Sequence, residues 1–178
     1  AYGNSVKNGS QIAVDEINAA GGVKVGEDTY MLKLSFKDDE ATEDKAVTAY
    51  NSLMDEGMNA LLGATTSGST LAITDLSNKD GILQITPTGS AKDITINDNV
   101  FRLCFTDPLQ GSTIAKYVLE NNYDSVAVLY NNSDEYSTGV YEAFKAELEK
   151  EGKGSIIVDT ESFTTQDIDF STQLTKIK

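Results

Sequence analysis

A run of hydroxyl-bearing residues separates an apolar stretch from an amphipathic one at residues 63–75, GATTSGSTLAITD. Backbone N–H groups at a helix N-terminus have no partner within the helix and lie at the positive end of its dipole, so they attract an anion. Gly68 lets a ligand approach the backbone closely, and the Ser67 hydroxyl adds a donor. The alternative is that Ser67 or Ser69 only caps the helix. Taken alone, the loop favours the cap, and it lacks the lysine of a phosphate-binding loop.

A second polar loop, TPTGSA at residues 86–91, follows the next apolar stretch. It offers a free carbonyl at Thr88 and a hydroxyl at Ser90. Acceptors beside donors suit a zwitterion, whose carboxylate takes N–H and hydroxyl donors and whose ammonium takes carbonyl and hydroxyl acceptors. The two loops together predict a site for the main-chain end of an amino acid.

The spacing of apolar residues predicts helices and strands in alternation. We expect helices over 3–20, 42–56, from about Ser69, over 110–122, over 135–151 and from Phe170, and strands over 30–38, 60–62, 81–85, 101–105, 125–130 and 155–158. This order predicts an α/β fold with a parallel sheet flanked by helices, because parallel neighbours need crossover connections. Ligands of such sheets bind beyond the carboxyl ends of the strands, where both polar loops are expected.

The composition excludes several classes of function. With 14 basic and 28 acidic residues the net charge is -14, so nucleic acid would be repelled and is not expected as a partner. Histidine is absent, which removes Ser-His-Asp and Cys-His catalysis and every His-containing metal site. Asp38-Asp39-Glu40 could form a metal or acid/base cluster, but consecutive carboxylates after a strand are usually a solvated loop. We therefore expect no enzymatic activity, no metal and no cofactor.

Two further features concern compartment and chain ends. The single Cys104 can form no internal disulfide, and its setting in FRLCF predicts a strand core. No run of about 18 apolar residues exists, so the sequence predicts no membrane span. The chain opens at AYGNSVKNG, close to a helix start and without a leading strand, and we expect it to be clipped at both ends.

Four blocks of the sequence, in register, resemble the branched-chain amino acid binding proteins of ABC transporters, which are type I periplasmic-type binding proteins. The blocks are AYGNSVKNGSQIAVDEINAAGGV, GATTSGSTLAITDLSNKDGILQITPTGSA, NVFRLCFTDPLQGSTIAKYV and VAVLYNNSDEYSTGVYEAFKAELEKEG. The resemblance implies a type I periplasmic-binding-protein fold, in which two α/β lobes joined by a hinge close over an amino acid. It places a first lobe without its first strand at residues 1–105 and an incomplete second lobe at 106–178, with the boundary at FTDPLQG.

The resemblance also implies roles for individual residues. Ser67 matches the residue that binds the ligand carboxylate through its hydroxyl and backbone N–H, and Ser90 matches one that gives hydroxyl and backbone contacts. Thr88 matches the residue whose carbonyl accepts from the ammonium. Tyr2 is similar to an aromatic beside the ligand side chain, and Tyr136 to a tyrosine reaching in from the second lobe. The alternatives are a helix staple for Tyr2 and a surface ring for Tyr136.

Two departures from the family pattern stand beside these roles. Thr66, also a ligand-binding candidate, occupies a position at which some members carry a disulfide to the position of Ala41, so that bridge is absent here. The family's usual acidic partner for the ammonium corresponds to a position beyond residue 178. Without the first strand, the sheet has unpaired edges and an exposed apolar face, so residues 1–178 are expected to be marginally stable alone or to rely on a partner chain.

The function implied by the resemblance is that of an extracytoplasmic solute-binding receptor, in the periplasm or as a cell-surface lipoprotein. It would capture a small amino acid, first of all a branched-chain one, and pass it to an ABC permease. Any membrane attachment would come from a lipid anchor outside these residues. The alternative is a ligand-sensing domain of a signalling receptor or regulator with the same fold.

Overall fold

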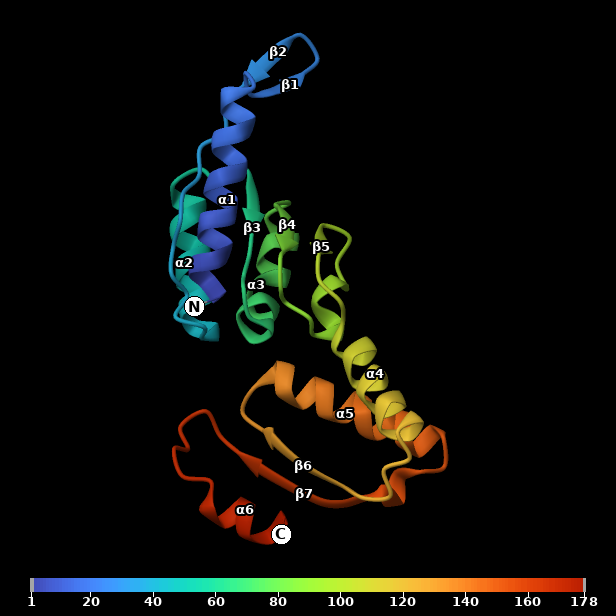
Figure 1. Ribbon diagram of the computed structural model, residues 1–178. Coiled ribbons are helices and arrows are strands. Elements are labelled where there is room, and N and C mark those ends of the chain that lie inside the picture. The colour runs from blue at the N-terminus through green and yellow to red at the C-terminus, as the bar shows by residue number, and fades with distance from the viewer. Residues whose placement is uncertain (1, 178) are drawn as a thin grey trace.

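Helices and strands of the chain fall into two groups, as the computed structural model shows for the described residues 2–177 (Figure 1). The N-terminal group comprises α1 (Tyr2–Ala19), β1 (Val23–Val25), β2 (Asp28–Tyr30), α2 (Glu43–Asp55), β3 (Ala60–Leu62), α3 (Ser67–Lys79), β4 (Leu83–Thr86), the 3₁₀ helix η1 (Lys92–Thr95) and β5 (Val100–Arg102). The C-terminal group comprises α4 (Asp107–Glu120), β6 (Val126–Asn131), α5 (Glu135–Lys150), the 3₁₀ helix η2 (Gly154–Ile156), β7 (Ile157–Phe163) and α6 (Ser171–Ile177).

Parallel sheets form the centre of each group. Strands β3, β4 and β5 pair in that order, and the register places Leu62, Ile85 and Phe101 side by side. Strands β6 and β7 form a second parallel pair. Helix α3 makes the crossover from β3 to β4 and α5 the crossover from β6 to β7, as parallel neighbours require. The predicted α/β architecture is confirmed.

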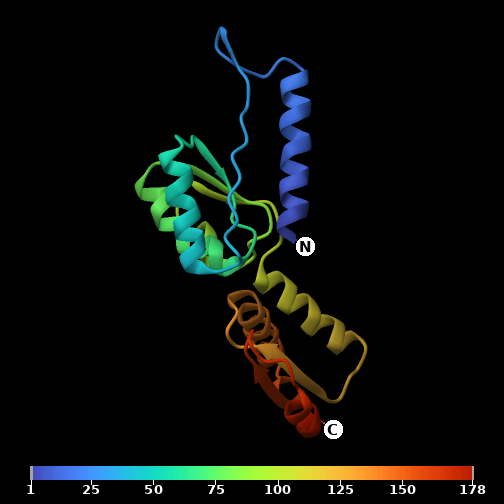
Figure 2. The ribbon, with the colours of Figure 1, turned by 90° about the vertical axis from the view of Figure 1, so that its left-hand side faces the viewer.

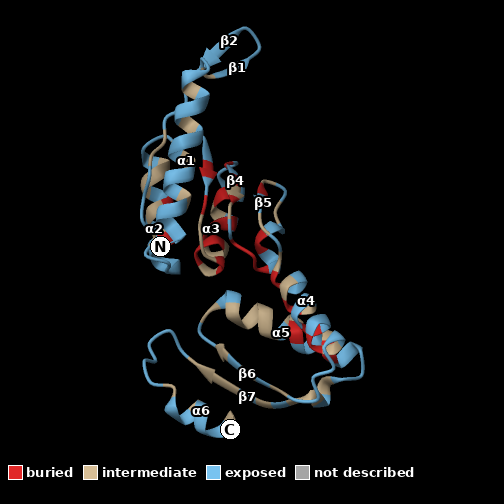
Figure 3. Ribbon diagram, in the orientation of Figure 1, coloured by how far each residue is buried: buried red, intermediate tan, exposed pale blue. Residues whose placement is uncertain are grey.

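The N-terminal core lies between the sheet and the helices α2 and α3. Its buried members are Ala46, Tyr50, Leu61, Ile73 and Ile82. Tyr50 donates from its hydroxyl to Asp80 Oδ2 at 2.9 Å, and burial followed by this hydrogen bond raises the pKa of Tyr50 to about 12. Figure 3 shows buried residues concentrated in α3, β4 and the start of α4, whereas α1 contains none. The helix that opens the chain therefore contributes little to this core.

An open space separates α1 from the sheet. A cavity of about 520 Å³ lies there, and its walls include Val6, Val14, Leu34, Phe36 and Leu61. Figure 2 shows α1 standing apart, with the extended segment that follows β2 running between it and the rest of the group. Strand β3 pairs with β4 on one side only, so its other edge faces this space. The unpaired edge expected from the sequence is present.

The strand predicted over residues 30–38 is wrong. Strand β2 ends at Tyr30, after an antiparallel hairpin with β1 that the sequence did not lead us to expect, and residues 31–38 belong to no sheet. Asn18 supplies a substitute, because its Nδ2 donates to the Leu32 carbonyl and its Oδ1 accepts from the Leu32 N–H, both at 2.8 Å. Alternating hydrophobicity over residues 31–38 indicates a half-buried extended segment. A β-strand, however, also needs a neighbouring strand to pair with.

Several predicted element ends move in the structure, and β7 moves most, because it ends at Phe163 and not at residue 158. Helix α3 begins at Ser67, two residues before the predicted start, and α4 begins at Asp107, three before. In α4 the cause is local, because the Thr106 hydroxyl caps the helix by accepting from Leu109 N at 3.3 Å. Strand β5 ends at Arg102, so Cys104 lies beyond the strand and not in a strand core, where its thiol donates to the Gly89 carbonyl at 3.4 Å.

Candidate functional site

The two polar loops meet at the hydroxyl of Ser67. Ser67 is the first residue of α3, and its Oγ accepts from the backbone N–H of Ser90 at 3.1 Å and from that of Ala91 at 3.2 Å. Both serines are 4% exposed. With two N–H groups directed at its lone pairs, the Ser67 hydroxyl keeps its own proton for a further acceptor. The structure thus joins the two predicted loops into one site.

Threonine side chains hold the two loops of this site in a fixed arrangement. The Thr86 hydroxyl donates to the Ala64 carbonyl at 2.8 Å and accepts from Gly89 N at 2.9 Å. The Thr88 hydroxyl donates to the Thr65 carbonyl at 2.5 Å. Within residues 2–177 nothing donates to the Thr88 carbonyl, which is the acceptor that the sequence assigned to an ammonium. The side chain of Thr88 therefore ties the loops together and leaves its carbonyl available.

Gly89 is required by the closeness of this packing. A Cβ built at Gly89 would lie 2.7 Å from Thr86 Oγ1, 2.8 Å from Thr70 Oγ1 and 2.9 Å from Ile94 Cδ1, shorter than real Cβ contacts. Any side chain at this position must push apart the walls of the loop. The glycine therefore follows from packing, because its φ is not in the left-handed region.

Arg102, at the end of β5, holds the second loop in place. Its Nη1 donates to the carbonyl of Ala91 at 2.6 Å and to that of Gly89 at 3.4 Å. Its Nη2 donates to Thr95 Oγ1 at 3.2 Å. The rigid guanidinium group thus donates to backbone and side-chain oxygens of residues 89–95 at the same time. Arg102 was not expected from the sequence, although a charge inside an apolar stretch, FRLCF, marks it.

Asp107 is the second residue that the sequence analysis missed. It is the first residue of α4, 1% exposed, and its backbone N–H donates to the Ser90 carbonyl at 3.0 Å. Burial raises the pKa of the Asp107 carboxyl, against the opposing effects of the Ser90 hydroxyl and the Arg102 charge. An Asp directly before Pro108, at a predicted lobe boundary, was the signal for a constrained position.

The remaining predicted residues are less closely joined to the site. Thr66 is the N-cap residue of α3, and its buried Oγ1 has no hydrogen-bond partner among the described residues. Tyr2 is 81% exposed at the start of α1, at the end of the N-terminal group that faces the C-terminal group in Figures 1 and 2. Tyr136 lies in the first turn of α5 and accepts from Gln110 Nε2 at 2.5 Å. No hydrogen bond joins either tyrosine to Ser67 or Ser90 in residues 2–177, so their ligand roles stay predictions.

The arrangement presents donors and acceptors for a small charged ligand. The backbone N–H groups of Ser67, Gly68 and Ser69 make no hydrogen bond with any described residue, and they lie at the positive end of α3. Among residues 2–177 no three His, Cys, Asp or Glu side chains come together as metal ligands. The site can therefore bind an anion at the N-terminus of α3 and a cation at the Thr88 carbonyl.

The model of the family described as "Periplasmic binding protein" matches residues 1–178, the whole chain. The chain belongs to the periplasmic binding protein family. The type I fold predicted from the sequence agrees with the solved structures of this family.

Curated relatives of this periplasmic binding protein chain are named for the amino acids they bind. The Leu/Ile/Val-binding protein BraC3 of Rhizobium johnstonii is 38% identical over 100% of the chain, which covers 47% of that relative. The Leu/Ile/Val/Thr-binding protein of Salmonella typhimurium is 31% identical over 99% of the chain, again 47% of that relative. The chain thus spans about half the length of the curated relatives it matches.

Solved periplasmic binding proteins show the same fold over the same half. LivJ of Streptococcus pneumoniae, a branched-chain amino acid transporter substrate binding protein solved with isoleucine, has a TM-score of 0.87 and 33% identity over 99% of this chain and 49% of its own. The leucine binding protein LivK of Thermotoga maritima has a TM-score of 0.83 and 26% identity, covering 99% of this chain and 48% of its own. In the part of our chain that the structure describes, no helix is long and apolar enough to cross a membrane.

Proposed function

We propose that these residues form part of a solute-binding receptor that captures a small amino acid, with a branched-chain amino acid as the first candidate. The observation that carries the proposal is the Ser67 hydroxyl, which joins two loops and keeps a free proton beside the unpaired N–H groups of α3. These donors suit an α-carboxylate, and the Thr88 carbonyl suits an α-ammonium. The names of the curated relatives support the choice of Leu, Ile or Val.

We further propose that the two groups of elements are lobes, with residues 1–105 in the first and 106–178 in the second. Ligand would bind between them and stabilise a closed arrangement, because only that arrangement contacts it from both sides. Tyr2 and Tyr136 would then line the pocket from opposite lobes, and Thr66 would lie beside the carboxylate. Helices α3 and α5 already contact each other across the boundary, which supports this geometry.

The receptor would act outside the cytoplasm and deliver its ligand to an ABC permease, without itself catalysing a reaction. The relatives are binding proteins and not enzymes by name. The alternative, a sensing domain of a signalling receptor, uses the same fold. A lipoprotein signal in the complete gene favours transport, and a membrane span followed by a kinase or methyl-accepting domain favours sensing.

Calorimetric titration of the intact protein tests the proposal directly. We expect a saturable heat of binding with at least one of Leu, Ile and Val, and weaker or no heat with a wider panel of amino acids. A panel of α-amino acids that all give no heat would contradict a site for a zwitterion. Turnover of any amino acid or amide by the purified protein would contradict the non-enzymatic part.

A further inference from the structure

The carboxyl group of Asp107 is buried without a hydrogen bond. The residue is 1% exposed, and neither Oδ1 nor Oδ2 has a partner among the described residues. Buried polar groups are normally paired, because leaving a charged one unpaired costs free energy. Helix α4 does not require this carboxyl as its cap, since Thr106 already fills that role. The unpaired group therefore calls for another explanation.

Asp107 is held next to Ser90 by a backbone hydrogen bond. Its backbone N–H donates to the Ser90 carbonyl at 3.0 Å, which holds the two residues together. The Ser90 hydroxyl lies close enough to favour the charged form of the Asp107 carboxyl, and it makes no hydrogen bond to any other described residue. Each of the two groups thus lacks the partner that the other can supply.

Helix α5 closes the space on the other side of Asp107. A Cβ built at Gly139 would lie 2.7 Å from Asp107 Oδ2 and 3.3 Å from its Cβ. A side chain at position 139 would therefore displace the carboxyl from this position. The side chain is confined between Ser90 and α5, and within residues 2–177 the Ser90 hydroxyl has the largest effect in favour of its charge, followed by Arg102.

We propose that Asp107 is a positioning residue that makes Ser90 an acceptor for the ligand ammonium. A hydroxyl has one proton and two lone pairs. When the Ser90 proton is donated to the Asp107 carboxylate, the Ser90 oxygen offers only lone pairs to the ligand. The negative charge behind it strengthens its hydrogen bond to a cation. The inference rests on the proposed function and adds that this site selects an ammonium group through a residue that does not touch the ligand.

The first experiment is a double-mutant cycle in the intact protein, with L-leucine as the probe and calorimetry as the readout. Asp107→Asn keeps the shape and removes the charge, and we expect it to weaken leucine binding about 10-fold, the effect of losing one charge-assisted hydrogen bond. In the Ser90→Ala background the same change should have an effect of less than about 3-fold, because non-additivity marks residues that act as a unit. The matched control, Asp98→Asn, removes an exposed carboxylate in the turn before β5 and should leave binding unchanged.

A second variant tests the position of the carboxyl without removing it. Gly139→Ala pushes on Asp107 Oδ2, and we expect it to weaken leucine binding in the parent but not in Ser90→Ala. Gly9→Ala, a helical glycine with open space around it, is its control. Circular dichroism verifies that each variant is folded, and if Asp107→Asn is not, the Gly139→Ala cycle decides.

The ammonium itself gives a readout that a purely structural role would not change. The ratio of the affinity for leucine to that for 4-methylpentanoate, the same skeleton without the ammonium, should fall in Asp107→Asn. A fall supports the proposal. An unchanged ratio, or an equal loss in both serine backgrounds, overturns it while leaving the proposed function intact. If the parent protein binds no α-amino acid at all, the proposed function fails first.

Discussion

At the scale of single residues, the two serine hydroxyls of the site have different roles. The Ser67 oxygen accepts from two backbone N–H groups of the second loop, so it is part of the structure before any ligand arrives. The Ser90 hydroxyl, in contrast, binds no backbone group of the described residues, and it favours the charged form of the neighbouring Asp107 carboxyl. The two serines, which looked equivalent in the sequence, therefore differ in what their removal should do.

We predict that Ser67→Ala weakens both ligand binding and folding, whereas Ser90→Ala weakens binding and costs less folding free energy, which comes from the Asp107 carboxylate losing a nearby hydroxyl donor. Each change should cost roughly 1 to 3 kcal/mol of binding free energy, since a charged ligand group loses a hydrogen bond. Ser67→Ala also leaves two buried N–H groups without an acceptor, which should lower the free energy of unfolding by about 1 to 3 kcal/mol. Calorimetry and urea denaturation measure the two quantities. Equal stability loss in both variants would contradict the assignment.

A second prediction at this scale concerns Asp107 and pH. Because burial raises its pKa in the folded state, the carboxyl favours folding most below its unfolded pKa, and this contribution is lost as the pH rises through the folded pKa. Burial and Asp134 disfavour the charge, whereas the Ser90 hydroxyl, Arg102 and the α4 dipole favour it, and burial dominates. Asp107→Asn should therefore raise the stability at pH 7, and the gain should vanish near about pH 3. Urea denaturation at the two pH values measures the gain, and a variant less stable at pH 7 would show that the charge stabilises the fold.

At the scale of elements, the sequence predicts the helices and strands that depend on local pattern. It fails for a strand whose pairing depends on a distant part of the chain. The helices α2 and α5 and the strands β3 and β6 lie within two residues of their predicted bounds, because caps and apolar spacing are local signals. Residues 31–38 keep the predicted extended form but belong to no sheet, since pairing depends on a distant strand.

The candidate site divides in the same way. Ser67, Thr88 and Ser90 are identified by residue type and by their place after a strand. Arg102 and Asp107 act on the second loop through contacts that appear only when the chain is folded. No spacing rule connects residue 91 with residue 102, so the sequence alone could not assign these supports.

We predict that Gly89→Ala disrupts the second loop as a unit. The added Cβ meets Thr86, Thr70 and Ile94 at distances below 3 Å, and overpacking of this kind costs about 1 to 3 kcal/mol of folding free energy. Leucine binding should weaken as well, because Ser90 and the Thr88 carbonyl move with the loop. Gly9→Ala, with nothing near its Cβ, is the control and should be neutral or slightly stabilising. A Gly89→Ala protein with unchanged thermal unfolding would mean that the loop adapts freely.

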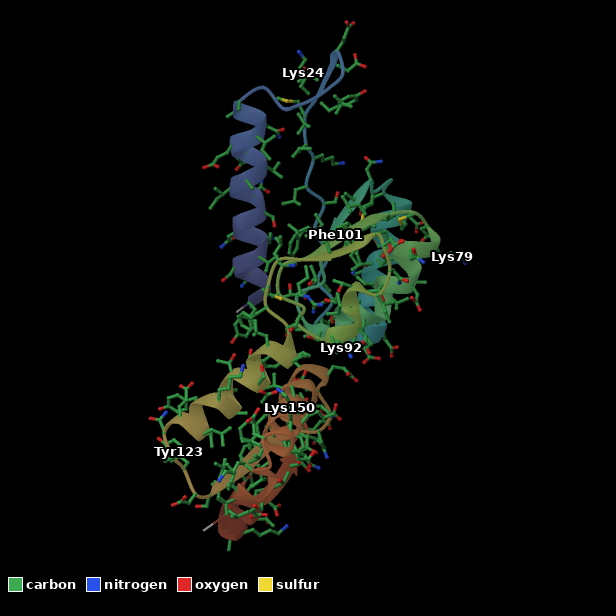
Figure 4. The ribbon with its side chains drawn as sticks, turned by 90° about the vertical axis from the view of Figure 1, so that its right-hand side faces the viewer. Lys24, Lys79, Lys92, Phe101, Tyr123 and Lys150 are labelled. Carbon is green, nitrogen blue, oxygen red and sulfur yellow. The ribbon has the colours of Figure 1, made fainter. Side chains whose placement is uncertain are left out.

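At the scale of the whole molecule, the described residues 2–177 leave one face of the first sheet uncovered. The register brings Leu62, Leu83 and Phe101 onto the face opposite α2 and α3, and all three are exposed. Figure 4 shows Phe101 on the side of the sheet turned toward α1, whereas Lys79 at the end of α3 lies on the other side. A contiguous apolar patch of this kind marks a surface that another part of a protein covers.

We therefore predict that residues 1–178, produced alone, associate with one another in a concentration-dependent way. Phe101→Ser removes the largest member of the patch and should shift the sedimentation profile toward the monomer. Ile168→Ser is the matched control, because Ile168 is 95% exposed in the loop before α6 and stands outside the patch, where a single apolar side chain has little consequence. Both substitutions remove a comparable exposed apolar side chain. If hydrophobicity alone drove association, both variants would sediment alike. If the sheet face drives it, only Phe101→Ser shifts the profile toward the monomer. If a segment outside these residues covers this face in the full-length protein, that protein should sediment as a monomer with or without Phe101→Ser. Association of the full-length protein through Phe101 would instead make the patch an interface between copies.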